Sequence, residues 1–323
     1  MKCINRIISL ILIINVLMLS GCGLNSYRLP YSYDTKLSAY SFSSASSSDM
    51  AQPFAGELCV TDHDTTEVAL DMSLVTAAGL FDVNGSETMY AKNVHKPLNP
   101  ASLTKVMTAM IALKYGKLDD ELTASSNVYI TESGAQLVGF KEGDRLTLDQ
   151  ALHALLMYSG NDAAIVIAEY ISGSVDSFVE LMNNEALQLG ATNTNFTNPH
   201  GLTDDAHITT AYDLYLIFNE AIKYEKFREI IHMTEYSSTY KDKDGNIKEL
   251  NFSNTNLYLS GVKYPPANVN VIGGKTGTTN AAGACLVLLS NDASGNPYIS
   301  VILQATDRDS LYDEMNILLM DVD

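Results

Sequence analysis

The sequence has no tryptophan, few cysteines and little positive charge. Its 323 residues include four cysteines and 20 lysines and arginines, against 38 aspartates and glutamates. The formal net charge of −18 excludes attraction to nucleic acid or to an anionic membrane by charge. In place of tryptophan, 18 tyrosines and 9 phenylalanines can fill a core, and 46% of the residues are hydrophobic. The length therefore suits one large domain, or two lobes that share a site.

Residues 1–21 are predicted to be a signal peptide. Lys2 and Arg6 precede a mostly apolar run at residues 7–19, which is shorter than the roughly 20 residues of a membrane span. Small residues then lead to Cys22, and this arrangement resembles the bacterial lipoprotein signal, in which the cysteine is lipidated. The alternative is an ordinary cleaved signal with a coincidental cysteine. The lipoprotein interpretation predicts export and anchoring at the outer face of the cytoplasmic membrane, facing the cell wall.

Residues 22–55 are predicted to be a flexible tether. They are rich in serine and tyrosine, contain the run Ser-Ser-Ala-Ser-Ser-Ser at 43–48, and have no hydrophobic period. Beyond the tether, Cys59 and Cys285 both fall in strand-like runs. Outside the cytosol they could form a disulfide, or they could be two buried free thiols, and their spacing does not decide between these.

The remaining part, residues 56–323, is predicted to be one domain whose strands open and close the sequence while helices fill the middle. Asn84-Gly85 indicates a hairpin turn between strands over residues 74–81 and 87–94. Hydrophobic periodicity and capping signals predict helices over residues 102–115, 147–158, 162–171, 175–189, 211–224 and 310–320, a turn at 244–246, and strands over 270–277, 284–290 and 298–305. This order predicts an α/β fold of the α+β type, with an antiparallel five-stranded sheet flanked by helices and an inserted helical lobe.

Three short motifs follow one another along this domain: Ser102-Leu-Thr-Lys105, Ser159-Gly-Asn161 and Lys275-Thr-Gly277. A serine hydroxyl is a weak nucleophile until a neighbouring base takes its proton. Ser102 and Lys105 are three residues apart on a predicted helix, so their side chains share one face. Burial beside a second cation, Lys275, would favour the neutral amine of Lys105, and the helix start offers N–H groups to an oxyanion. The set predicts acyl transfer through Ser102.

Each of these motifs is weak when it is taken alone. Ser-x-x-Lys occurs again at Ser238-Thr-Tyr-Lys241 and Ser260-Gly-Val-Lys263, and Ser-Gly-Asn occurs again at Ser294-Gly-Asn296. Neither additional Ser-x-x-Lys opens an apolar helix, and the additional Ser-Gly-Asn follows the Lys-Thr-Gly motif and so breaks the order. The order of helix start, interhelical loop and strand therefore selects Ser102.

With Pro100-Ala101 before the serine, the three motifs resemble the signatures of penicillin-recognising serine enzymes. The runs at residues 196–202, 207–213 and 273–278 extend the resemblance to low-molecular-weight penicillin-binding proteins, the D-alanyl-D-alanine carboxypeptidases of serine peptidase family S11. The resemblance runs from about residue 74 to the C-terminus. It implies the penicillin-binding-protein/β-lactamase-like fold, removal of the terminal D-alanine from peptidoglycan stem pentapeptides, and inhibition by β-lactam antibiotics.

The resemblance also implies roles for the matching residues. Ser102 would be acylated by the penultimate D-alanine carbonyl, with Lys105 as the base. Ser159 and Asn161 would relay a proton and hold the substrate amide. No cofactor is expected.

On the strand motif, the resemblance implies substrate binding. Lys275, Thr276 and Thr278, with Gly277 between the threonines, would attract the terminal carboxylate. The backbone N–H groups of Ser102 and Thr278 would form the oxyanion hole.

The chain departs from the family in two respects. Many members have a second C-terminal β-domain, for which too few residues follow Lys275 here. Some members carry a basic residue where this chain has Thr255, which would leave carboxylate recognition more dependent on Lys275 and the threonines. His200 and His207 have no helical spacing and no acidic or cysteine cluster around them, so structural roles are predicted for both, and no metal.

Two alternatives are weighed against a carboxypeptidase. A β-lactamase of the same fold is one, although the Glu-x-x-Leu-Asn segment of class A members is not found. A non-catalytic penicillin-sensing or wall-binding lipoprotein is the other, although such a protein would not need Lys105 and Lys275.

Overall fold

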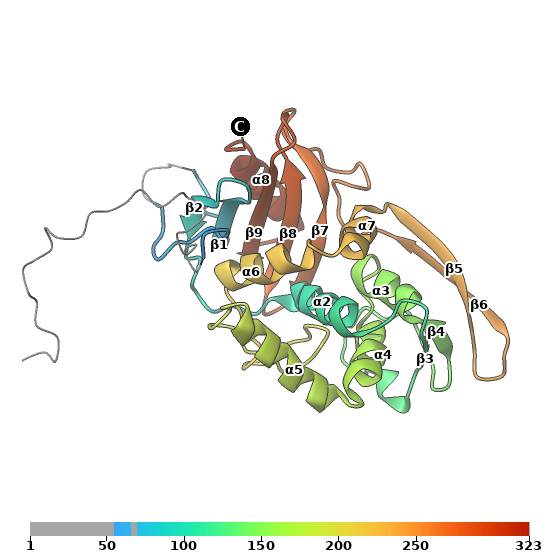
Figure 1. The fold of residues 1–323 in the computed structure, drawn as a ribbon. Coiled ribbons are helices and arrows are strands. Elements are labelled where there is room, and N and C mark those ends of the chain that lie inside the picture. The colour runs from blue at the N-terminus through green and yellow to red at the C-terminus, as the bar shows by residue number, and fades with distance from the viewer. Residues whose placement is uncertain (1–54, 66–69, 323) are drawn as a thin grey trace, which may run out of the picture. The chain divides into compact units, whose positions relative to one another are not determined.

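A five-stranded antiparallel sheet forms the centre of the computed structural model, which describes residues 55–65 and 70–322 (Figure 1). Its spatial order is β2-β1-β9-β8-β7, and its strands are β1 Val75–Asp82, β2 Glu87–Lys92, β7 Asn270–Thr279, β8 Gly283–Asn291 and β9 Pro297–Ala305. The first two strands of the domain therefore lie beside the last three, and β7 is an edge strand. The predicted fold class is confirmed. The predicted signal peptide, Cys22 and nearly all of the tether lie outside the described residues.

Helices cover both faces of this sheet (Figure 1). Helix α8 (Arg308–Leu319) packs on one face, and α6 (Ala211–Ala221) packs on the other. Successive side chains of a strand point to opposite faces, so Leu286 and Leu288 of β8 join the apolar cluster beneath α8, whereas Val287 joins the cluster on the α6 side. A strand with apolar residues on both faces is thereby buried almost throughout, as β8 is.

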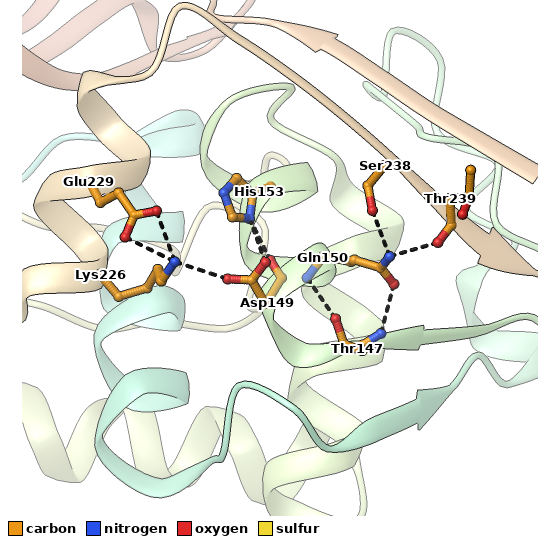
Figure 2. Close-up of polar contacts among 8 residues, drawn as sticks. All are labelled: Thr147, Asp149, Gln150, His153, Lys226, Glu229, Ser238 and Thr239. Atoms are coloured by element: carbon orange, nitrogen blue, oxygen red, sulfur yellow. Dashed lines mark hydrogen bonds and ion pairs between the residues drawn. The ribbon is translucent and has the colours of Figure 1, made fainter.

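The helical lobe is built around α2 (Lys105–Tyr115), which is buried over most of its length, as its apolar sequence predicts. Around it lie α3 (Leu148–Leu156), α4 (Asn161–Ser172), α5 (Val175–Gln188) and α7 (Glu225–His232). The capping box that opens α3 is present: Gln150 N donates to Thr147 Oγ1, and Thr147 N donates to Gln150 Oε1 (Figure 2). The predicted helices are confirmed with ends that differ by a few residues, but α7 was not predicted as a separate helix.

A second, four-stranded sheet borders this lobe and was not predicted. Its order is β3-β4-β5-β6, with β3 Glu121–Thr123, β4 Arg145–Thr147, β5 Glu235–Lys241 and β6 Ile247–Ser253. Two of these strands have three residues, which is too short for an alternating pattern to be recognised. The predicted turn joins β5 to β6, and Gly245 in it has a φ of 85°. Gln150 Nε2 ties β5 to α3 by donating to Ser238 Oγ and Thr239 O (Figure 2).

The two cysteines of the described residues are free and buried, so the structure has the free thiols and not the disulfide. Cys59 Sγ donates to Asp82 O, and Cys285 Sγ donates to Ala282 O. Burial raises the pKa of the Cys59 thiol to about 11 and that of the Cys285 thiol to about 12. Both thiols therefore stay protonated at neutral pH and act as small apolar core groups.

Candidate active site

Ser102 lies in a short 3-10 helix, η2 (Ala101–Thr104), that leads directly into α2. The sequence predicted a continuous helix from residue 102, and the structure begins it with this tighter turn. Ala101, which precedes the serine, has a left-handed φ of 48° that non-glycine residues rarely adopt. The half-buried Ser102 side chain meets Lys105 across the junction, where Lys105 Nζ lies 2.8 Å from Ser102 Oγ.

The Lys105 amine is the most enclosed group of the site. Its Nζ makes hydrogen bonds with Ser102 Oγ at 2.8 Å, Asn161 Oδ1 at 2.7 Å and the His200 carbonyl oxygen at 2.6 Å. Burial, and then the positive charge of Lys275, hold the pKa of Lys105 well below its usual value. A lysine kept neutral in this way can accept the proton of the serine hydroxyl that it touches.

A second hydroxyl and a second buried amine meet beside this pair. Ser159, in the loop between α3 and α4, has a left-handed φ of 68°, and its Oγ accepts from Lys275 Nζ at 3.0 Å. Lys275 also donates to the Thr276 carbonyl oxygen at 2.7 Å. Burial lowers the pKa of Lys275 to about 7. Asn161, two residues after Ser159, opens α4 and brings the loop into contact with Lys105.

Strand β7 passes close to the backbone of Ser102. A Cβ placed on Gly277 would lie 2.9 Å from Ser102 N, so a side chain at this position would press against the turn that carries the serine. Thr276 is half-buried on the neighbouring position, and Thr278 is exposed. Contacts thus link Ser102, Lys105 and Asn161 into one group and Ser159 and Lys275 into another, with Gly277 beside the first.

Arg308 is a charged residue at this site that the sequence did not single out. It is the first residue of α8, and its Nη2 donates to the Thr255 carbonyl oxygen at 2.8 Å. The hydroxyls of Thr255 and Thr276 are hydrogen-bonded at 2.7 Å. The structure therefore places a guanidinium next to Thr255, where the sequence indicated that a basic group was missing.

His200 and His207 contact two residues that follow Ser102, Lys105 and Thr104 respectively. The His200 carbonyl oxygen accepts from Lys105, and its ring Nδ1 accepts from Leu202 N at 3.2 Å. Burial is the main cause that lowers the pKa of His200 to about 3 and that of His207 to about 4, so both rings are neutral at pH 7. In the described part of the chain, no group of three or more His, Cys, Asp or Glu side chains could hold a metal ion.

A serine beside a buried amine with a lowered pKa, together with a second hydroxyl and a second buried lysine, is the arrangement that serine acyl transfer requires. Residues 65–307 match the model of the D-alanyl-D-alanine carboxypeptidase family, and the chain belongs to this family.

Two curated relatives carry the name of that family. The chain is 34% identical to D-alanyl-D-alanine carboxypeptidase DacF of Bacillus subtilis over 215 residues, which are 65% of this chain and 52% of DacF. It is 34% identical to DacC of Escherichia coli over 240 residues, which are 71% of this chain and 56% of DacC. The chain thus spans about half the length of these two relatives. The crystal structure of the Streptomyces K15 DD-transpeptidase is similar with a TM-score of 0.72 and 26% identity, over 80% of this chain and 98% of that one.

Proposed function

We propose that this chain is a serine-type D-alanyl-D-alanine carboxypeptidase, which removes the terminal D-alanine from peptidoglycan stem pentapeptides through an acyl-enzyme on Ser102. The observation that carries the proposal is the buried Lys105 amine, 2.8 Å from Ser102 Oγ, whose pKa is depressed by burial and by Lys275. The names of DacF and DacC support the same reaction.

In the first half of the proposed reaction, Ser102 Oγ attacks the carbonyl carbon of the penultimate D-alanine while Lys105 Nζ takes the hydroxyl proton. Backbone N–H groups of Ser102 and Thr278 stabilise the oxyanion. The C–N bond then breaks, and the proton that Lys105 took passes through the Ser159 hydroxyl, which lies 3.0 Å from Lys275 Nζ, to the leaving amine of the terminal D-alanine, so that Lys105 becomes neutral again. Water hydrolyses the resulting ester and regenerates the serine, with Lys105 as the base for the water.

We propose that the stem peptide binds along β7. This strand is at the edge of the sheet, so an extended peptide can add to it through backbone hydrogen bonds. The terminal carboxylate is attracted by Lys275, the threonines of β7 and Arg308, which reaches Thr255 beside Thr276. These cations are important because the net charge of −18 repels an anionic substrate elsewhere.

A transpeptidase is the second candidate, because the Streptomyces K15 neighbour is named for that reaction. The two reactions share the acyl-enzyme and differ in whether water or an amine takes the acyl group. A β-lactamase differs from both in releasing a penicilloyl group rapidly.

One experiment separates these functions. The purified mature protein is incubated with a pentapeptide that ends in D-Ala-D-Ala, with and without glycine as an amine acceptor, and separately with penicillin, and products are followed by mass spectrometry. We expect loss of one D-alanine and a long-lived penicilloyl adduct on Ser102, and neither with Ser102→Ala. A product formed only with glycine would make the protein a transpeptidase, and rapid turnover of penicillin would make it a β-lactamase. No reaction with either ligand would contradict the proposal.

We also propose that the protein acts at the outer face of the cytoplasmic membrane. The predicted signal peptide (1–21), lipidation at Cys22 and tether (22–55) support this, with residues 56–323 as the catalytic domain. Among the residues that the structure describes, no helix has the length and the apolar character to cross a membrane. Metabolic labelling with an alkyne fatty acid should mark the wild type and not Cys22→Ser, and equal labelling of the two would overturn the anchor.

A further inference from the structure

The turn that carries Ser102 contains a strained residue whose conformation must be held by its surroundings. Ala101 has a φ of 48°, a conformation that costs free energy for any residue with a Cβ. Its carbonyl oxygen accepts a hydrogen bond from Thr104 Oγ1 at 2.8 Å. A Cβ placed on Gly201 would lie 1.9 Å from the same oxygen, so the backbone of residue 201 closes the other side.

The Thr104 hydroxyl is in turn held by His207. The backbone N–H of Thr197 donates to His207 Nδ1 at 3.0 Å, which makes Nδ1 the acceptor in the neutral ring. The ring hydrogen is then on Nε2, which is 2.8 Å from Thr104 Oγ1 and donates to it. Because that oxygen receives the His207 hydrogen, its own hydrogen is directed to the Ala101 carbonyl.

From His207 to Ala101 the groups of this series are buried, and each hydrogen bond between them has a defined direction. Ala101, Thr104 and His207 are each at most 1% exposed. Water therefore has no access to replace a lost partner, and an unmade hydrogen bond leaves a buried polar group unsatisfied. The series runs from Thr197 to the residue that directly precedes the nucleophile.

A base or metal-ligand role does not fit His207. Both ring nitrogens already have partners, Nδ1 in Thr197 N and Nε2 in Thr104 Oγ1, and neither makes a hydrogen bond with Ser102. Packing alone also does not explain why a histidine occupies this position. Its ring makes a tilted contact with Phe196 at 5.6 Å, which a purely apolar side chain could equally make.

We propose that His207 is a positioning residue for acyl transfer, which acts through Thr104 on the Ala101 carbonyl and so fixes the turn that aims the Ser102 hydroxyl. This inference rests on the proposed function, because its consequence is measured as the rate at which Ser102 is acylated. Small displacements of a reacting group lower rates strongly, by about 100-fold for a misplacement near 1 Å.

Two substitutions of His207 separate positioning from folding. The amide nitrogen of Gln reaches about as far as Nε2, so His207→Gln keeps the donor to Thr104 and loses the acceptor for Thr197. The amide oxygen of Asn reaches about as far as Nδ1, so His207→Asn keeps that acceptor and loses the donor. We expect His207→Asn to lower the acylation rate constant for penicillin about 10- to 100-fold, with little change in the prior non-covalent Kd. His207→Gln should retain most of the rate.

A double-mutant cycle tests whether Thr104 transmits the effect. Thr104→Val removes the hydroxyl, whereas Thr104→Ser keeps it and should stay near the wild-type rate. If His207 acts through Thr104, then adding His207→Asn to Thr104→Val should lower the acylation rate constant little further, because the effects of coupled residues are not additive. If Thr104→Val does not fold, the comparison of His207→Asn with His207→Gln still decides.

His153 provides a matched control. His153 is 2% exposed and is not one of the site residues described above. It contacts the carbonyl oxygen and the carboxylate of Asp149 (Figure 2), and its ring stacks on Tyr236. His153→Asn should lower the Tm by about as much as His207→Asn and leave the acylation rate constant unchanged.

The outcomes are distinguishable from those that test the proposed function. A wild-type protein that penicillin does not acylate contradicts the proposed function itself. If penicillin acylates the wild type, the positioning role alone is overturned by either of two results. One is that His207→Asn and His207→Gln lower the acylation rate constant equally, and the other is that each lowers it only in proportion to its loss of Tm.

Discussion

Ser102 and Lys105 occupy the start of a buried helix, whereas Ser238 and Lys241, with the same spacing, occupy strand β5. On the helix, residues three apart share a face, and the two side chains meet at 2.8 Å. On a strand, residues three apart point to opposite faces, so Ser238 and Lys241 diverge. Ser238 Oγ instead accepts a hydrogen bond from Gln150 Nε2 (Figure 2). Lys241 is exposed.

The third pair, Ser260 and Lys263, differs from the first in the charge around its lysine. Lys263 lies 3.2 Å from Asp309 and 3.4 Å from Asp313, and hydrogen bonds to these carboxylates raise its pKa. Burial and a neighbouring cation lower the pKa of Lys105. The same four-residue pattern therefore gives a potential base only where backbone geometry and burial agree.

Substitution of the three serines should give the largest difference between the three Ser-x-x-Lys pairs. Ser102→Ala should abolish labelling by a fluorescent penicillin, because Ser102 Oγ is the hydroxyl that lies 2.8 Å from the Lys105 amine, whose pKa is strongly lowered. Ser238→Ala and Ser260→Ala should label like the wild type on a gel. Labelling that persists in Ser102→Ala, or disappears in Ser238→Ala, would contradict the assignment.

Substitution of the lysines should come next in size. Lys105→Ala should lower the acylation rate constant by about 10²- to 10⁴-fold, which is the usual contribution of a general base. The non-covalent Kd for penicillin should change little, because the amine acts in the transition state. Lys263→Ala should keep the wild-type rate constant in the same stopped-flow measurement. A loss of affinity alone in Lys105→Ala would argue against the base role.

Substitutions of two surface cations near α8, Arg308 and Lys263, should differ more modestly in their effect on kcat/KM. Arg308→Ala should lower kcat/KM for a D-Ala-D-Ala peptide about tenfold, equivalent to ~1.4 kcal/mol of charge-assisted hydrogen bonding. Lys263→Ala, whose partner Asp309 is the next residue along α8, is the control and should leave kcat/KM unchanged. If Arg308→Ala has no effect on this ratio, the carboxylate is bound elsewhere.

A separate comparison, of stability and not of rate, uses the pH dependence of unfolding. The pKa of Lys275 is about 7 in the folded protein and near 10.5 when unfolded, so between these values only the unfolded state keeps the proton. The free energy of unfolding should therefore rise with pH across this window, with a slope of up to ~1.4 kcal/mol per pH unit from this group.

Two lysine variants test that slope by urea unfolding at pH values from 7 to 10. Lys275→Met should remove the contribution of Lys275 and flatten the rise. Lys263→Met should not, since the raised pKa of Lys263 makes its stabilising contribution decline only at higher pH. Identical slopes in the wild type and Lys275→Met would show that Lys275 keeps its proton in the folded state.

The elements that could be predicted from the sequence are those whose signal is local and repeated. The capping box at Thr147 and the turn at Asn84-Gly85 are complete within a few residues, and the central strands are long enough to show their apolar character. The strands β3 and β4 are too short for this. Disulfide formation between Cys59 and Cys285 could not be decided, because spacing along the chain does not give proximity.

The site was predictable in its motifs but not in its surroundings. Ser102, Lys105 and Asn161 meet as the motif order indicated. Arg308 was missed because only the path of β9 into α8 brings it to Thr255. His207 was recognised as structural, but the direction of its hydrogen bonds to Thr104 depends on the tertiary contact with Thr197.

The edge position of β7 has a further consequence for the behaviour of the protein in concentrated solution. An open edge that can receive a peptide strand can equally receive the strand of a neighbouring molecule, which is the usual route to edge-to-edge aggregation. If the stem peptide binds along β7 as proposed, this edge has to stay uncovered and a helix cannot protect it. The net charge of −18 opposes such association by mutual repulsion, which salt screens over about 10 Å at 0.1 M. The acidic surface thereby keeps the molecules apart while the edge stays open.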